Sequence, residues 1–165
     1  MNPKQNITLI GSGLSGPVMA TYLSSLGFSV DVYEARPDMR KNSVPAGRSI
    51  NLALSARGIR ALKDIGAFEK IEPNLIPMRG RMIHDVNGNN NFQPYGQKKS
   101  EVIFSVSRSN LNKVLMSYAE STNKVNFYFN HELQNVDIKK SKLRFNKNQI
   151  PFNVVLGSDG ASSKV

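Results

Sequence analysis

The segment GSGLSG, residues 11–16, carries three glycines at the spacing G-x-G-x-x-G, a pattern that can bind the pyrophosphate of a dinucleotide. Its context supports this reading, because it follows the short β-rich apolar segment 6–11 and opens a segment with helical spacing of apolar residues. Gly11 is expected to permit the tight turn, Gly13 to let the backbone approach a phosphate, and Gly16 to permit close helix–strand packing. The helix N-terminus adds free N–H groups and partial positive charge for the same phosphate.

A carboxylate accompanies this glycine pattern. Glu34 closes the next β-rich segment, residues 28–35, where it can accept both hydroxyls of an adenosine ribose. The segments 6–11, 14–27 and 28–35 have the patterns of strand, helix and strand with tight connections, which predicts a parallel pair of strands with a right-handed crossover. These residues predict a dinucleotide site, but they do not distinguish FAD from NAD.

A second glycine-containing motif, GSDG at residues 157–160, follows a predicted strand at 152–157. Asp159, at the carboxyl end of that strand, could reach a ribose, or a pyrophosphate through a water molecule. A domain that binds only NAD(P) gives no reason for such a motif this far along the chain, so the motif favours FAD. A plain Asp-Gly turn is the alternative interpretation.

Two arginines lie inside a segment with the pattern of a β-strand. Arg79 and Arg81 are two residues apart, so on a strand they share a face, which is either solvated or binds an anion. Residues 80–96 flank an Asn-Gly turn signal and predict a hairpin. If that hairpin folds symmetrically about Gly88, Arg81 and Tyr95 become cross-strand neighbours.

The other segments predict further strands and helices. A polar loop is expected at 36–49, and Ser55 is expected to cap a helix that runs to about Ile65. A second helix is predicted for residues 108–121. Strands are predicted for residues 50–55, 101–107, 124–130, 132–139, 142–146 and 152–157.

The composition excludes several kinds of site. The chain has 165 residues, no cysteine and two histidines, which excludes disulfides, thiolate metal sites and a cysteine nucleophile, and argues against an all-histidine metal site. The formal net charge is +10. The basic residues are scattered and lack interleaved aromatic residues, so we expect a solvated basic surface and no nucleic-acid partner. With no signal peptide and no membrane-length apolar run, the sequence predicts a cytoplasmic protein.

Several longer motifs together resemble the family of FAD-dependent aromatic hydroxylases. They are VYEAR (32–36), GRSINLALSARG (47–58), PMRGRMIHD (77–85), QPYG (93–96), SVSRSNLN (105–112) and GSDGASS (157–163). Within the family, GRSINLALS and MRGRMIH are specific to members that hydroxylate kynurenine. The resemblance covers essentially the whole chain. It implies FAD as cofactor, NADPH and O2 as co-substrates, and L-kynurenine as the small-molecule substrate, with 3-hydroxykynurenine as product.

The resemblance also implies roles for individual residues. Arg81 and Tyr95 match residues that hold the substrate's amino-acid carboxylate, whereas Arg79 stays unassigned and His84 is expected to be structural. No residue is assigned as a catalytic base, because the flavin carries the chemistry. In addition to the three glycines, Glu34 and Asp159, the implied FAD contacts are Leu14, Ser15, Tyr33, Ala35, Arg36, Ala53, Arg108 and Leu133.

The expected fold class is α/β, with a Rossmann-like FAD-binding domain around a parallel sheet and an inserted β-hairpin region that starts a substrate domain. We expect residues 1–165 to be the N-terminal part of a longer monooxygenase, truncated directly after GSDGASSKV, with residues of about 80–105 contributing to the substrate site. The chain alone is then expected to bind FAD weakly and to be inactive. Three alternatives remain: another FAD-dependent aromatic hydroxylase, an NAD(P)-dependent dehydrogenase domain, and a non-catalytic nucleotide-binding fragment.

Overall fold

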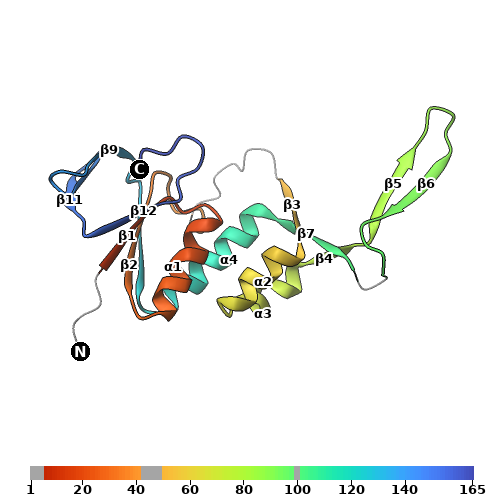
Figure 1. The fold of residues 1–165 in the computed structure, drawn as a ribbon, viewed down its shortest axis with the longest axis horizontal. Coiled ribbons are helices and arrows are strands. Elements are labelled where there is room, and N and C mark those ends of the chain that lie inside the picture. Colours follow the sequence, from red (N-terminus) through yellow and green to blue (C-terminus); the bar gives the residue numbers. More distant parts are fainter. Residues whose placement is uncertain (1–5, 42–49, 99–100) are drawn as a thin grey trace. The chain divides into compact units, whose positions relative to one another are not determined.

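The computed structural model describes residues 6–41, 50–98 and 101–165 (Figure 1). The chain divides into two compact units. The first combines its two ends, Met1–Gly47 and Asn112–Val165, and the second is the intervening Arg48–Leu111. The part of the predicted polar loop at residues 42–49, with the start of the motif GRSINLALSARG, lies outside the described residues.

The first unit is organised around a parallel sheet with the strand order β12-β1-β2-β8. β1 pairs in parallel with β2 and with β12, which confirms the predicted strand–helix–strand unit. An antiparallel meander in the order β11-β10-β9 completes the unit. Its elements are β1 (Asn6–Ile10), α1 (Ser15–Ser25), β2 (Ser29–Glu34), most of α4 (Arg108–Glu120), β8 (Val125–Phe129), β9 (Leu133–Asp137), β10 (Lys142–Phe145), β11 (Gln149–Pro151) and β12 (Val154–Gly157).

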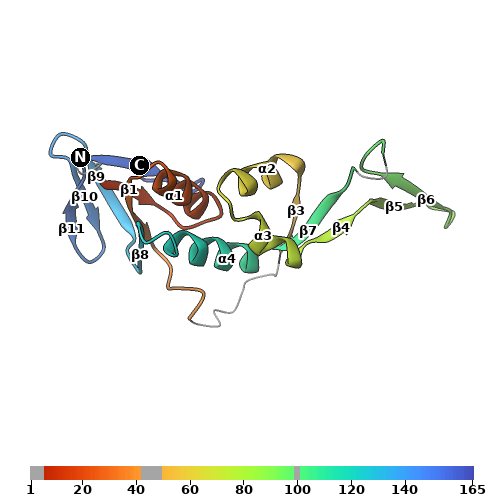
Figure 2. The same cartoon turned by 90° about the horizontal axis from the view of Figure 1, so that it is seen from below.

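Two apolar cores lie on opposite faces of this sheet. Helices α1 and α4 cover one face and the meander covers the other (Figures 1 and 2). Because successive side chains of a strand point to opposite faces, Leu9 and Ile10 of β1 enter different cores. The helix-side core comprises Leu9, Ala20, Val30, Val32, Ala119 and Val125, and the meander-side core comprises Ile10, Tyr33, Leu133, Leu143 and Phe145.

The buried face of α1 consists of small residues. The helical spacing of Leu14, Val18, Tyr22 and Leu23 indicates an apolar stripe. However, the Tyr22 side chain is 48% exposed, and of this stripe Leu23 packs against the helix-side core. The residues that α1 buries include Gly16, Ala20 and Ser24. Small side chains allow the helix axis to approach the sheet closely. The buried face of α1 is therefore the one with small residues and not the one with the large apolar residues.

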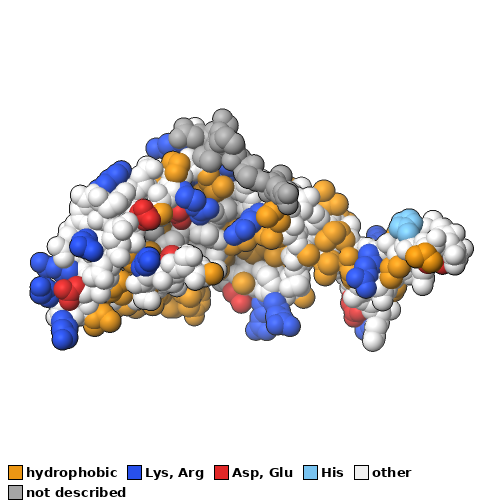
Figure 3. Space-filling model, turned by 90° about the horizontal axis from the view of Figure 1, so that it is seen from above, with side chains coloured by type: hydrophobic (Ala, Val, Ile, Leu, Met, Phe, Trp, Pro, Cys, Tyr) orange, Lys and Arg blue, Asp and Glu red, His pale blue; other side chains and the backbone are white. Residues whose placement is uncertain are grey.

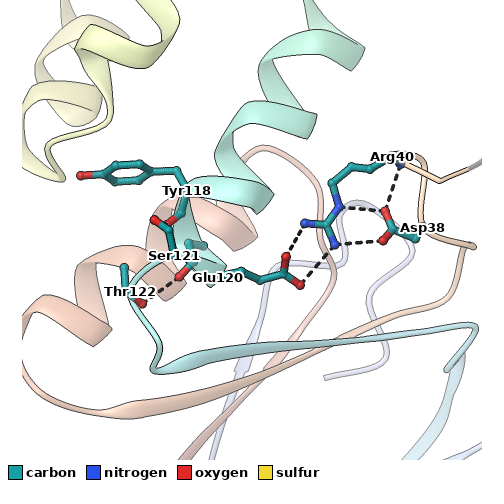
Figure 4. Close-up of polar contacts among 7 residues, drawn as sticks. Asp38, Arg40, Tyr118, Glu120, Ser121 and Thr122 are labelled. Atoms are coloured by element: carbon teal, nitrogen blue, oxygen red, sulfur yellow. Dashed lines mark hydrogen bonds and ion pairs between the residues drawn. The ribbon is translucent and has the colours of Figure 1, made fainter.

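An ion-pair network ties the segment after β2 to the end of α4 (Figure 4). The Arg40 guanidinium donates to both carboxylate oxygens of Asp38 and also pairs with Glu120. It lies over the rings of Phe127 and Phe129, 5.8 and 5.6 Å from their centroids. The hydrogen bond from Arg40 lowers the pKa of Asp38. All three charged groups are paired, so the network is structural.

The second unit contains an antiparallel sheet in the order β3-β7-β4 and a separate hairpin, β5–β6. Helix α2 begins after Ser55 as predicted, and the Ser55 carbonyl accepts from the Ile59 N–H, but the Ser55 side chain makes no capping hydrogen bond. The elements are β3 (Asn51–Leu54), α2 (Ala56–Asp64), α3 (Phe68–Ile71), the 3-10 helix η1 (Glu72–Asn74), β4 (Ile76–Met78), β5 (Gly80–His84), β6 (Asn90–Pro94), β7 (Ile103–Ser107) and the first turn of α4.

The basic side chains of the described surface are dispersed (Figure 3). On the face drawn in Figure 3, Lys and Arg side chains stand singly or in small groups between uncharged side chains. In the described part of the chain, no helix is long and apolar enough to span a membrane. The same residues hold no cluster of three or more His, Asp or Glu side chains that could bind a metal ion.

Candidate dinucleotide site

The glycine loop, residues 11–16, connects β1 to α1 and packs against the end of β12. Gly11 has φ +96°, and a Cβ there would lie 2.6 Å from the Ser158 carbonyl oxygen. A Cβ on Gly16 would collide with the Gly11 carbonyl oxygen. Both glycines are therefore required by close backbone approach, as the fingerprint predicted.

Gly13 is different because it faces open space. No described atom lies within 4 Å of the position that its Cβ would take. The space beside the Gly13 backbone is therefore not filled by any described protein atom. The loop leads directly into α1, whose first N–H groups lack intrahelical partners and attract an anion. This combination fits a phosphate group held against the backbone at Gly13.

Glu34 lies at the end of β2 with its carboxylate beside the glycine loop. Its Oε2 accepts the Ser12 N–H at 2.7 Å, and its Oε1 accepts from the Arg36 N–H at 3.0 Å and from Arg36 Nε at 2.7 Å. The residue is only 6% exposed. Burial alone would raise the pKa of Glu34, but the hydrogen bonds from Arg36 and Ser12 outweigh it and the pKa is lowered. The carboxylate is therefore ionised at neutral pH.

This lowered pKa predicts a pH-dependent contribution to stability. An ionised Glu34 favours the folded state, so its contribution is present above the ordinary carboxyl pKa of 4.5 and is lost as the pH falls through the folded-state pKa. We expect Glu34→Gln to lower the free energy of unfolding at neutral pH. The difference from the parent should shrink as the pH falls from neutral through the lowered folded-state pKa of Glu34, because both side chains are then uncharged. Urea unfolding across this range measures it, and a pH-independent difference would contradict the assignment.

The GSDG motif meets the glycine loop in space. Ser158 Oγ donates to the carbonyl oxygens of Ile10 and Gly11, both at 2.8 Å, and the Ser158 N–H donates to Ile10 O. Asp159 follows directly: its Oδ2 accepts the Lys164 N–H at 3.0 Å, and its Oδ1 is buried without a partner among the described residues. Two motifs from opposite ends of the chain are thus in direct contact.

Asn112 of α4 also contacts this loop, although the sequence analysis did not assign it. Its Nδ2 donates to the Ser12 carbonyl oxygen at 2.9 Å, across 100 residues of sequence. Its Oδ1 and the Ser12 Oγ are buried, and neither has a partner in the part of the chain that is described. One signal was available in the sequence: Asn112 is a polar residue on the side of α4 that also carries the buried Met116 and Ala119.

The hairpin of the second unit has a different register from the predicted one. Arg81 lies opposite Gln93, and Arg81 Nε donates to Gln93 Oε1 at 2.7 Å. Tyr95 instead donates its N–H to the Arg79 carbonyl oxygen, so the predicted direct pairing of Arg81 with Tyr95 is wrong. In this register Arg81 and Tyr95 are diagonal neighbours on one face of the hairpin. Residues in such positions are about 7–8 Å apart, a distance that long side chains can bridge.

The turn explains the shift of register. The Gly88 N–H donates to the Asp85 carbonyl oxygen, and Gly88 has φ +82°. Gly88 is thus the left-handed residue that ends a three-residue loop, and the centre of the hairpin falls on Asn87. The Asp85 carboxylate fixes this turn by accepting the N–H groups of Asn87 and Asn89.

Comparison with known proteins gives this site a family. Residues 4–165 match the family described as FAD binding domain. The chain belongs to this family. The matched residues include the second unit and nearly all of the first.

Similar proteins in this family carry a common name. The chain is 41% identical over 166 residues to a kynurenine 3-monooxygenase of Legionella pneumophila, 41% identical over 168 residues to one of Myxococcus xanthus, and 38% identical over 166 residues to one of Anopheles gambiae. These matches cover 98%, 98% and 97% of the chain. They cover 37%, 36% and 34% of the relatives, so the chain spans little more than a third of their length.

Solved structures support the fold. The tetrameric form of 2-methyl-3-hydroxypyridine-5-carboxylic acid oxygenase matches with a TM-score of 0.80 at 20% identity. The match covers 98% of this chain and 41% of that one. The p-nitrophenol 4-monooxygenase of Pseudomonas putida matches with a TM-score of 0.75 at 16% identity. At these identities the likeness concerns the fold alone, and it agrees with the predicted α/β class.

The residues of the first unit fit FAD, the cofactor for which the family is described. Gly13 leaves room for a phosphate, and Glu34 places its carboxylate beside the same loop. Buried polar atoms without partners cost free energy unless a ligand or water satisfies them. Three such atoms, Ser12 Oγ, Asn112 Oδ1 and Asp159 Oδ1, belong to residues at or beside the glycine loop. A dinucleotide with hydroxyls and phosphates is a suitable partner for them.

Two predicted FAD contacts have their side chains committed elsewhere. The Tyr33 ring stacks on Tyr128 and Phe145, with centroids 4.8 and 4.7 Å away, and burial raises the pKa of Tyr33 to about 12. Leu133 is buried in the same meander-side core. Any contact from either residue to the cofactor therefore has to come from its backbone. The Tyr33 carbonyl oxygen already holds the loop by accepting the Gly11 N–H at 2.8 Å.

The remaining predicted contacts lie at exposed or half-buried positions. Leu14 precedes α1, Ser15 begins it, and Ala35 and Arg36 follow Glu34. In the second unit, Ala53 lies on β3 opposite Ser105, and Arg108 begins α4 with an exposed side chain. The contacts of all six residues with FAD remain predictions.

Proposed function

We propose that the protein carrying this chain hydroxylates L-kynurenine to 3-hydroxykynurenine, with bound FAD and with NADPH and O2 as co-substrates. The observation that carries the proposal is the identity of 38–41% over nearly all of the chain to proteins named kynurenine 3-monooxygenase. Identity at this level spans both the dinucleotide site and the hairpin with Arg81. The motifs GRSINLALS and MRGRMIH, which resemble motifs of kynurenine hydroxylases, also support kynurenine as the substrate.

When bound, FAD supplies the redox chemistry that takes two electrons from NADPH and activates O2. One oxygen atom of O2 enters the ring and the other leaves as water, so the electrons balance. The tasks of this chain are binding and orientation. With FAD bound, Glu34 would accept the ribose hydroxyls, and the loop at Gly13 and the α1 N-terminus would receive the pyrophosphate. Asp159 lies beside that loop.

The hairpin is proposed to hold the substrate carboxylate. Gln93 accepts from Arg81 Nε, which leaves the two terminal nitrogens of the guanidinium as a fork. A guanidinium fork binds a carboxylate through two parallel hydrogen bonds. The Tyr95 hydroxyl, diagonal to Arg81, adds a third donor. No described residue needs to act as a general base, so none is assigned.

Two measurements on the purified natural protein test the proposal. We expect a flavin absorption spectrum that stays with the protein on gel filtration, and NADPH oxidation that kynurenine stimulates. Absence of flavin together with NAD(P) reduction would favour the dehydrogenase alternative. Bound flavin without any response to kynurenine would point to another aromatic hydroxylase, and anthranilate and benzoate derivatives would then be compared as substrates.

A further inference from the structure

The backbone of Ser12 is held from both sides by buried side chains. Its N–H donates to Glu34 Oε2 at 2.7 Å and its carbonyl oxygen accepts from Asn112 Nδ2 at 2.9 Å. Glu34 is 6% exposed, Asn112 is 6% exposed and Ser12 is 1% exposed. The Gly11–Ser12 and Ser12–Gly13 peptide groups are therefore both fixed in orientation. The Ser12–Gly13 peptide group carries the Gly13 N–H.

The orientation of the Asn112 amide follows from this contact. The Ser12 carbonyl can only accept, so the NH2 group of Asn112 must face it and Oδ1 must point elsewhere. The same NH2 group lies 3.5 Å from Met39 Sδ, a weak acceptor. Oδ1 and Ser12 Oγ are left buried without partners among the described residues. A carboxylate in place of the amide would have the same shape but could not donate.

We propose that Asn112 is a positioning residue for the cofactor loop: it fixes the Ser12–Gly13 peptide so that the loop backbone meets the pyrophosphate, and leaves Ser12 Oγ free for the ligand. This inference rests on the proposed FAD function. It assigns to α4 a part in cofactor binding that does not require contact between Asn112 and the flavin. The Gly11–Ser12 peptide is held by Glu34 and by Ser158, and the Ser12–Gly13 peptide by Asn112. Loss of Asn112 therefore frees the Ser12–Gly13 peptide.

The test compares Asn112→Asp and Asn112→Leu with the parent in the natural protein. Ser117→Asp is the matched control, because it adds the same charge as Asn112→Asp at an exposed position of α4. Hydrogen exchange of flavin-free protein is followed at residues 11–16 and, as a reference, at β8. The dissociation constant of FAD is measured by the change in flavin fluorescence on titration of the flavin-free protein.

We expect both Asn112 variants to speed exchange at residues 12–14 by about tenfold or more while β8 keeps its protection, because one buried hydrogen bond is lost locally. We expect the dissociation constant of FAD to rise by about tenfold or more, and Ser117→Asp to change neither quantity. A merely structural role would instead raise exchange throughout the first unit.

Three results would overturn the inference. One is unchanged exchange in the loop, another is a uniform rise across the unit, and the third is faster loop exchange with unchanged FAD affinity. If the parent itself binds no FAD, the proposed function fails. The exchange comparison then still decides whether Asn112 holds the loop.

Discussion

Glu34→Ala is expected to remove most of the FAD from the protein. The substitution deletes two hydrogen bonds from ribose hydroxyls to a charged acceptor, each worth about 1.5–3 kcal/mol. It also releases the Ser12 N–H, which Glu34 Oε2 accepts at 2.7 Å, so the Ser12 backbone loses one of its two side-chain partners. The combined loss predicts a dissociation constant at least about a hundredfold higher. Flavin absorbance of the protein peak on gel filtration measures the effect.

Two control variants locate the cause of that loss. Glu34→Gln keeps an acceptor at Oε1 and nearly the same shape, so it should retain more FAD than Glu34→Ala. Glu69→Ala removes an exposed carboxylate from α3 and should retain the parent's flavin content. Full flavin occupancy in Glu34→Ala would show that Glu34 is not the ribose acceptor.

Arg81→Ala is expected to weaken kynurenine binding strongly while FAD stays bound. The change removes a charged bidentate partner from the substrate carboxylate, a loss of about 2–5 kcal/mol when the pair is desolvated. Tyr95→Phe removes one neutral donor and should cost about 0.5–1.5 kcal/mol. Titration of the flavin spectrum with kynurenine measures both dissociation constants.

The corrected register makes Arg79 the informative control for this experiment. Arg79 lies opposite Tyr95 and shares the face of Arg81. If Arg81 holds the carboxylate, Arg79→Ala should bind kynurenine more nearly like the parent, and so should Arg60→Ala on α2, whose side chain is 85% exposed. A larger loss for Arg79→Ala than for Arg81→Ala would transfer the role to Arg79. Parent-like binding in all of these variants would refute a carboxylate site on this hairpin.

The local features of the dinucleotide site could be predicted from sequence because each rests on a short-range constraint. Gly16 is required by close approach to the Gly11 backbone within one strand–turn–helix unit, and Gly11 has the positive φ of the tight turn. Glu34 closes the neighbouring strand of a parallel pair. The position of Asp159 beside the loop followed from a recurrent motif at the end of a strand. These patterns place residues without knowledge of the rest of the fold.

The features that were missed depend on contacts between distant residues or on turn geometry. Asn112 reaches Ser12 across 100 residues, which no local pattern encodes. The hairpin register is decided by the Asp85 carboxylate and the left-handed Gly88, and a shift of one residue in the centre changes the partner of Arg81. The Tyr33 side chain is different, because strand alternation alone places it on the opposite face from Glu34, in the meander-side core.

The most direct test of the account is oxygen insertion into kynurenine. The natural protein, supplied with FAD, NADPH, kynurenine and isotopically labelled O2, should form 3-hydroxykynurenine that carries one labelled oxygen atom, detected by mass spectrometry and by co-elution with an authentic standard. The amount of product should follow the amount of NADPH consumed. NADPH consumption that yields only hydrogen peroxide, or a hydroxylated product without label, would contradict the proposed kynurenine hydroxylation.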